Sequence, residues 1–187
     1  PAAAYFGGAG GGLGVEVEYT PPLLDVSQHT VNTTSRGRVR IPSGIGHQVI
    51  GLGLDATTRT SGSISGELPP RGGATWETGD GDVKALAGVD YRIPLGVFDT
   101  PLPGPRPYKP VFLGAGAILW GQTAFYGDVD TGAFETEDSF FLGLEAEGRF
   151  NILHLPVSAG AGVATRLDWS LSTAIGQDDV RVYVFAS

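Results

Sequence analysis

Apolar and polar residues alternate along most of this chain with a period of two. The stretch "GVEVEYT" (residues 14–20) alternates apolar residues with glutamate, and "RGRVRIP" (36–42) alternates them with arginine. Because successive side chains of a β-strand point to opposite faces, this alternation predicts strands with one apolar and one polar face. No capping box leads into a 3.6-residue apolar stripe, so the pattern predicts an all-β protein.

Eight alternating segments follow one another along the chain. They cover approximately residues 8–19, 36–41, 48–60, 83–93, 111–125, 140–152, 157–169 and 180–185. Their connections alternate between short and longer polar stretches, which predicts an antiparallel up-and-down sheet in one domain over residues 1–187. One connection departs from this rhythm, because the proline-rich "GVFDTPLPGPRPYKP" (96–110) falls where a short turn is expected.

The lengths of the segments and their glycines indicate which face is inside. Most segments are longer than the ~5–6 residues of an average strand in a soluble protein, and they suit the ~9–11 residues of a membrane-crossing strand. Glycine weakens a solvent-exposed strand, whereas inside a narrow barrel it leaves room for large side chains opposite. The polar faces are rich in glycine, with Gly8, Gly10, Gly12, Gly14, Gly114, Gly116, Gly160 and Gly162.

Aromatic residues and paired charges favour the same orientation. Aromatic side chains near the ends of the apolar faces suggest the girdles that flank a membrane barrel; they are Tyr5, Tyr19, Tyr91, Phe125, Phe140, Phe150 and Trp169. The polar faces carry charges of opposite sign, with Glu16 and Glu18 beside the arginines of the next segment, and Glu145 and Glu147 near Arg166. Charges inside a small barrel need such partners. The predicted fold is therefore an eight-stranded antiparallel up-and-down transmembrane β-barrel with its charges inward.

Composition restricts the function further. Charged residues make up only 17% of the chain, and the formal net charge is −8, which argues against nucleic-acid binding. Cysteine is absent, so thiolate chemistry and disulfides are excluded. The opening "PAAAYFGG" has the small-residue character of a signal-peptide cleavage region, so we expect a removed signal peptide and a place in the outer membrane of a bacterium.

The N-terminal "AAYFGGAGGGLGVEVEY" and the C-terminal "VRVYVF" resemble the first and last strands of the small outer-membrane barrels of the OmpA, OmpX and OmpW kind. The resemblance lies in the pattern over the whole chain, and no diagnostic motif carries it. It departs at the end, where Ala186 and Ser187 follow the aromatic Phe185, and we expect no periplasmic domain. The low lysine and high glycine, alanine and arginine content indicates a GC-rich source, and the chain also resembles the abundant small barrel of Thermus-type outer membranes.

The inward charges are the first candidate site. They predict either a salt-bridge plug, which we favour because eight strands enclose only enough space for side chains, or the lining of a narrow pore. The candidate network consists of Glu16, Glu18, Arg36, Arg38, Arg40, Glu145, Glu147, Arg149, Arg166, Asp168 and Arg181.

The loop "GDVDTGAFETED" is a second, weaker candidate. Its Asp128, Asp130 and Glu135 are ligands suited to calcium, but their spacing does not match an EF-hand, and a solvated acidic loop is the simpler interpretation. No other cofactor is expected. His29, with Ser27 and Asp25 near it, falls in a predicted outer loop, but this spacing prescribes no nucleophile and base, so we expect no enzyme.

The predicted function is therefore structural or adhesive. The barrel would contact the lipid bilayer, contribute to membrane integrity and present its loops to extracellular or cell-envelope partners. Two alternatives remain open: a small diffusion pore, and a soluble lipocalin-like carrier in which the faces are inverted and the apolar side chains line a cup.

Overall fold

The computed structural model describes residues 9–20, 30–60, 71, 81–104, 110–128, 131–153, 155–169 and 180–186. These residues form one sheet of eight strands, with no helix long and apolar enough to cross a membrane. The strands are β1 (Gly10–Thr20), β2 (Thr30–Pro42), β3 (Val49–Arg59), β4 (Val83–Pro101), β5 (Val111–Asp128), β6 (Ala133–Ile152), β7 (Leu155–Asp168) and β8 (Val180–Ala186).

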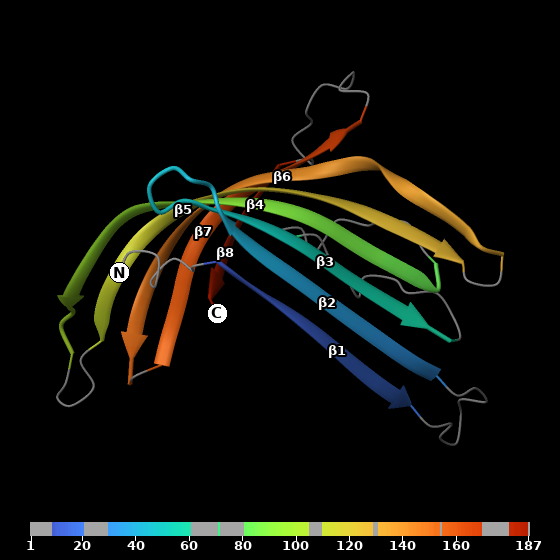
Figure 1. The fold of residues 1–187 in the computed structure, drawn as a ribbon, viewed down its shortest axis with the longest axis horizontal. Helices are drawn as coiled ribbons and strands as arrows, with labels where there is room; N and C mark the ends of the chain where they lie inside the picture. Colours follow the sequence, from blue (N-terminus) through green and yellow to red (C-terminus); the bar gives the residue numbers. More distant parts are fainter. Residues whose placement is uncertain are drawn as a thin grey trace.

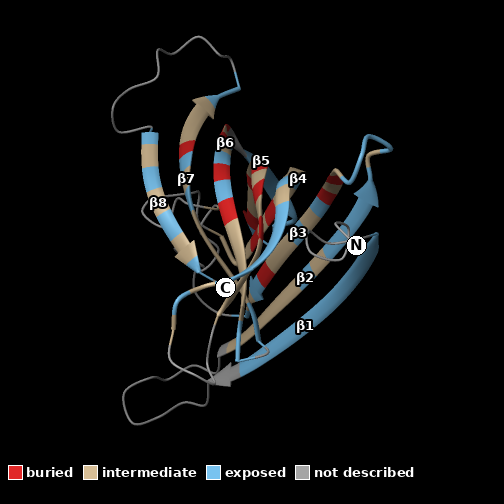
Figure 2. Ribbon diagram, turned by 90° about the vertical axis from the view of Figure 1, so that its left-hand side faces the viewer, coloured by how far each residue is buried: buried red, intermediate tan, exposed pale blue. Residues whose placement is uncertain are grey.

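Each strand pairs antiparallel with its neighbour in sequence, so the predicted all-β up-and-down sheet is confirmed. Figure 1 shows the sheet bent into an arch, and Figure 2 shows β1 and β8 at its two margins. Among the residues that the structure describes, β1 and β8 do not pair with each other. The short connections join β2 to β3 and β6 to β7, and they lie at the same end of the sheet as the first residues of β1.

Three strands extend at least six residues beyond the segments that the alternation predicts. β2 begins at Thr30, six residues before the expected start, and β6 begins at Ala133, inside the acidic loop. β4 continues to Pro101, into the proline-rich connection, where its pairing with β5 shifts twice between Pro94 and Thr100. Proline cannot donate a ladder hydrogen bond, so it is tolerated where a bulge already interrupts the register. The alternation ends at such a bulge, which is why it misses this part of the strand.

The apolar face of the sheet points outward, and the polar face lines the inside of the arch, where it is buried on the central strands. Leu13 and Val182 on the two margins are each 82% exposed, whereas Glu145 in the middle of the sheet is 1% exposed. Figure 2 shows this gradient, with the buried positions gathered on the central strands and the exposed ones on the margins. Trp120 of β5 also donates a hydrogen bond to Tyr183 of β8, and side chains from such separated strands meet only on the concave face of a bent sheet.

Glycines on the concave face accommodate large side chains from neighbouring strands. A Cβ atom on Gly143 would lie 2.4 Å from the Trp120 ring, and one on Gly162 would lie 2.7 Å from the ring of Tyr183. Both pairs are direct neighbours in the register of the sheet. At these positions the glycine-rich polar face has the role expected from the sequence. Gly10, Gly12 and Gly14 of β1 differ, because nothing lies within 4 Å of a Cβ added there.

Candidate functional site: an arginine-lined cavity

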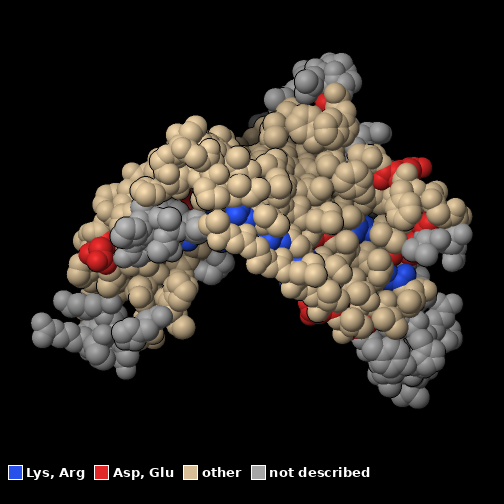
Figure 3. Space-filling model, viewed as in Figure 1, with Lys and Arg blue, Asp and Glu red and all other residues tan. Residues whose placement is uncertain are grey.

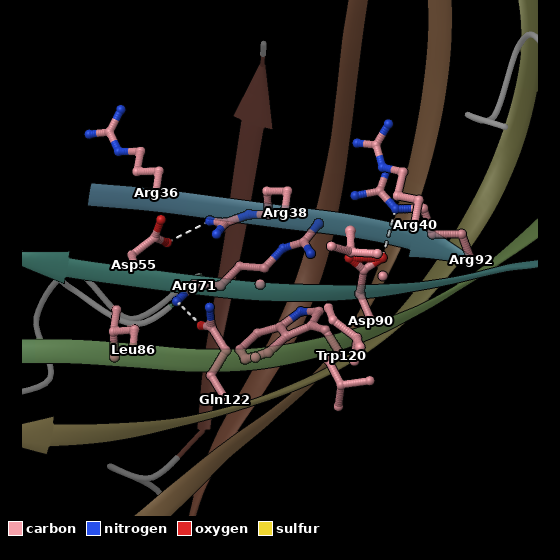
Figure 4. A pocket seen from close by; sticks show the side chains of 16 residues that line it. Arg36, Arg38, Arg40, Asp55, Arg71, Leu86, Asp90, Arg92, Trp120 and Gln122 are labelled. Carbon is pink, nitrogen blue, oxygen red and sulfur yellow. Dashed lines mark hydrogen bonds and ion pairs between the residues drawn. The ribbon is translucent and has the colours of Figure 1, made fainter. Parts of the chain in front are cut away.

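The concave face holds a cavity of about 480 Å³ between β2, β3, β4 and β5. Its charged lining comes mostly from the polar positions of these strands, and Trp120 and Gln122 contribute from β5 (Figure 4). Basic side chains predominate over the two aspartates, Asp55 and Asp90. The basic residues are Arg36, Arg38, Arg40, Arg71 and Arg92.

The register of the sheet explains why this cavity exists. Arg38 of β2 lies between Gly12 of β1 and Gly53 of β3, and Arg40 lies between Gly10 and Gly51 in the same way. Glycine has no side chain, so Arg38 and Arg40 have no bulky register partner on either strand, whereas Arg36 lies between Gly14 of β1 and Asp55 of β3. Alternation on β2 therefore places three arginines on one face. The glycines of β1 beside them have open space above, whereas Asp90 fills the space over Gly51 and Arg38 fills that over Gly53.

One of these arginines is paired within the cavity. Arg38 Nη2 lies 2.5 Å from Asp55 Oδ2, and the Arg38 guanidinium lies over Gly53, where an added Cβ would be 3.0 Å from Nη1. Figure 4 shows Arg38 extending toward Asp55, whereas Arg36 extends to the other side of β2. The pair is partly open to solvent, so we expect it to orient Arg38 more than to stabilise the fold.

A second network joins β4 to β6 at the end of the cavity near the short turns. Arg92 Nε lies 2.7 Å from Asp90 Oδ1, and its Nη1 lies 3.9 Å from Glu147 Oε2. Glu147, which is buried, also accepts a hydrogen bond from Arg149 Nε at 2.6 Å. Two arginines thus balance two carboxylates, and the buried Glu147 has the partners that a charge in a low-dielectric interior requires.

A third network crosses the concave face around Glu145. This carboxylate forms an ion pair with Arg71 and accepts a hydrogen bond from the Tyr183 hydroxyl, which in turn accepts one from Trp120 Nε1 at 3.1 Å. The backbone N–H of Arg71 donates to Gln122 Oε1 at 2.6 Å, and its guanidinium lies 5.9 Å from the Trp120 ring centroid. The network therefore ties the connection between β3 and β4 to β5, β6 and β8.

The cavity as a whole has an excess of positive charge. Counting the cavity lining and the partners bound to it gives six arginines and four carboxylates. Within the described part of the chain, Arg36 and Arg40 form no ion pair. The two unbalanced positive charges therefore belong to β2, next to the glycines of β1.

The structure places all eleven residues of the predicted charge network on the concave face, but it groups them differently from the expected pairs. Glu16 and Glu18 lie opposite Thr34 and Asn32 and not opposite the arginines, and these four residues line a separate hollow of about 310 Å³. Arg166 donates to Ser139 Oγ at 2.7 Å, so Glu145 and Glu147 pair with other arginines. Asp168 and Arg181 belong to β7 and β8, outside the cavity lining.

The predicted aromatic residues fall into two groups on the outward face. Phe140 and Trp169 pack at the end with the longer loops, with ring centroids 4.8 Å apart. Phe150 packs near the short turns against Phe112, at 5.2 Å, and Phe112 stacks on Phe98. Tyr91 donates to the side chain of Gln48, and Phe125 is half-buried. Tyr5 and the side chain of Tyr19 lie outside the described residues.

The acidic loop uses its described carboxylates in local contacts. Asp128 Oδ1 accepts a hydrogen bond from the Thr131 N–H at 3.0 Å, and Glu135 accepts one from the Tyr126 hydroxyl at 3.1 Å. Asp130 lies outside the described residues, as do Ser27, His29 and Asp25. Among the residues described, no three acidic or histidine side chains converge on a position suited to a metal ion.

Sequence reasoning missed several members of these networks. Asp55, Asp90 and Arg92 occupy polar positions of the alternation, so the period of two was sufficient to identify them as members of the charge network. Arg71 had no such signal, because it belongs to the long polar connection between β3 and β4. Tyr183 lies in "VRVYVF", where both faces are largely apolar and alternation does not show which one is inside.

Comparison of the chain with protein-family models, with curated proteins and with solved structures gives no match.

Proposed function

We propose that this chain is an integral outer-membrane protein, in which the bent sheet closes into an eight-stranded barrel braced internally by ion pairs, and that its role is structural or adhesive. The observation that carries the proposal is the inverted arrangement of the two faces. Leucine and valine side chains cover the convex face, while charged residues fill the concave one. Figure 3 shows basic groups in a row across the middle of the molecule, surrounded by mostly uncharged surface. Lipid stabilises such an apolar exterior, whereas water does not.

The dimensions of the apolar face support a membrane location. Phe140 and Phe150 on β6 belong to the two aromatic groups, and the outward positions between them are Leu142, Leu144, Ala146 and Gly148. Ten residues at ~3.3 Å each span about 33 Å along the strand, which a tilt of ~40° reduces to a height of about 25 Å. This height corresponds to the apolar band of an outer-membrane barrel.

The braced interior favours a structural role. The Glu145 network crosses the concave face from β5 and β6 to β8, and the Glu147 network joins β4 to β6. A carrier of apolar ligands needs an apolar cup, and the concave face is charged instead, which disfavours the lipocalin-like alternative. The resemblance of the terminal strands to those of OmpA-like barrels agrees with a structural protein, since many such small barrels have a side-chain-filled interior.

A small diffusion pore is the second candidate function. The specific observation in its favour is the open space above Gly10, Gly12 and Gly14, since nothing lies within 4 Å of a Cβ added at any of them. Bilayer conductance of the purified protein distinguishes the two candidates: a braced structural barrel gives no steps, and a pore gives discrete ones.

Membrane insertion is tested first by electrophoresis and then by a pair of variants. A folded outer-membrane barrel migrates differently in SDS before and after boiling, and we expect this shift for the protein from the membrane fraction. Leu144→Arg, midway between the aromatic groups, should reduce the free energy of folding into lipid vesicles by about 2–4 kcal/mol. The matched control Leu155→Arg, at the start of β7, should reduce it by about 0–1 kcal/mol because it lies near the interface.

Two results would contradict the proposal. One is a monodisperse protein in buffer without detergent that has a single mobility on the gel. The other is an equal effect of the two arginine variants, since a face in contact with water has no dependence on depth.

A further inference from the structure

We infer that the arginine-lined cavity binds a small dianionic oxyanion, such as phosphate or sulfate, through Arg36 and Arg40 of β2. The inference goes beyond the proposed structural role, and it requires only that the concave face is accessible to water and small solutes. It is carried by three features of the described residues: unbalanced charge, space, and a rigid surround.

The charge of the cavity specifies the sign and magnitude of the ligand. Asp55 accompanies Arg38, while Asp90 and Glu147 accompany Arg92 and Arg149. Glu145 is engaged by Arg71. Arg36 and Arg40 have no ion-pair partner within the described ranges, so a ligand with two negative charges would neutralise the cavity.

The chemistry of the side chains specifies an oxyanion. The planar guanidinium group donates two parallel N–H bonds to phosphate, sulfate or carboxylate oxygens, and spherical anions such as chloride do not match this geometry. Arg36 and Arg40 start about 13 Å apart on the strand, at ~3.3 Å per residue, and long flexible side chains allow both groups to reach one ligand. Arg38 lies between them but is directed toward Asp55.

The space for the ligand is provided by glycines. Gly14 and Gly10 of β1 are the register partners of Arg36 and Arg40; they lie beside the cavity lining and not in it, and both have open space above them. The cavity volume of about 480 Å³ falls in the range of small-molecule sites, which is roughly 300–1,000 Å³. A phosphate ion therefore fits beside β2 with its hydration shell partly retained.

The side chains that surround the site are held in place by contacts with residues outside it. Trp120 is buried and bonded to Tyr183, and the Asp90 carboxylate fills the space above Gly51. Because these groups are held by the neighbouring networks, the ligand would meet a preorganised wall across the cavity from Arg36 and Arg40.

The test is titration calorimetry of the folded protein in a neutral maltoside detergent with inorganic phosphate, compared with chloride at equal ionic strength. We expect saturable heat with phosphate and none with chloride. Arg36→Gln and Arg40→Gln should each weaken phosphate binding about tenfold, because each removes a charge-assisted hydrogen bond, and the double variant should abolish it. Arg59→Gln is the matched control and should bind phosphate as the unmodified protein does, since Arg59 contacts Asn32 outside the cavity.

Three results would overturn the inference: no phosphate heat from protein that still shows a boiling-dependent gel shift, equal affinity of the double variant, or an equal response to chloride. A second titration replaces phosphate by phosphatidylglycerol in mixed micelles, and binding of the lipid alone would also overturn it, because the site would then recognise a headgroup from outside. The gel shift is measured on every sample, so failure of phosphate binding is distinguishable from failure of the proposed membrane location.

Discussion

On β5 and β6 the polar face of the sheet is covered by packed side chains (the packed region), whereas on β1 and β2 the same face is open to solvent (the bare region). Glu145 and Glu147 of β6 are 1% and 5% exposed, and both are held by hydrogen bonds from cationic or phenolic groups. Glu16 and Glu18 of β1 have the same alternation in sequence, but they are exposed and lie opposite Thr34 and Asn32. Their hollow contains no cationic side chain among its lining residues.

The difference shows that alternation determines which face of the sheet a side chain occupies. The residues on the adjacent strands determine whether that side chain is buried in a network or left open to solvent. On β6 and β7, glycines lie beneath Trp120 and Tyr183, so large side chains fill the concave face and bury the charges. On β1, glycines lie beside arginines with no aromatic group over them, so the space stays open. The packed region is suited to bracing the sheet, and the bare region is suited to accepting a ligand.

The largest contrast between the two regions should come from neutralising one glutamate in each. Glu145→Gln removes the charge that balances Arg71 while keeping the shape of the side chain. Because it breaks a buried pair from one side, we expect the free energy of unfolding to decrease by about 3 kcal/mol. Glu16→Gln, on an exposed site, should change it little. Equilibrium unfolding in urea from vesicles measures both, and equal effects would show that the packed and bare regions do not differ.

A smaller contrast should come from adding one methyl group to a glycine in each region. Gly143→Ala places a Cβ 2.4 Å from the Trp120 ring, so the ring must shift, which disturbs its hydrogen bond to Tyr183. Overpacking of this kind costs about 1–3 kcal/mol. Gly12→Ala meets nothing within 4 Å and should leave stability unchanged. The same unfolding assay measures both variants, and a destabilised Gly12→Ala would show that the region beside the arginines is filled.

The fold was largely predictable because its signal is local. Alternation of the "GVEVEYT" kind depends only on which residues follow one another, and it identified all eight described strands with their antiparallel order. The boundaries were less predictable, since β2 begins at Thr30 in a polar stretch without alternation. Bulges in β4 hid its continuation to Pro101, because a bulge interrupts the period of two.

The pairing of the charges was not predictable because it depends on register. A shift of two residues between β1 and β2 would place Glu16 beside Arg36, and the sequence pattern is the same in both registers. The observed register places Gly14 there instead. Arg71 shows a second limit: a residue in a long connection enters the Glu145 network only through the path of the chain in space.

The smallest effect, and the most specific, should come from removing the Tyr183 hydroxyl. It donates to Glu145 and accepts from Trp120, so Tyr183→Phe leaves the Trp120 N–H without its partner while the ring still fills the space over Gly162. A lost hydrogen bond of this kind costs about 1 kcal/mol. In the Glu145→Gln background the same substitution should cost less, since the charged acceptor is already absent, and this double-mutant cycle measures the coupling. Additive effects would mean that the hydroxyl and the carboxylate act independently, and that the packed region is held by apolar contacts around Phe141 and Ile118 rather than by its polar network.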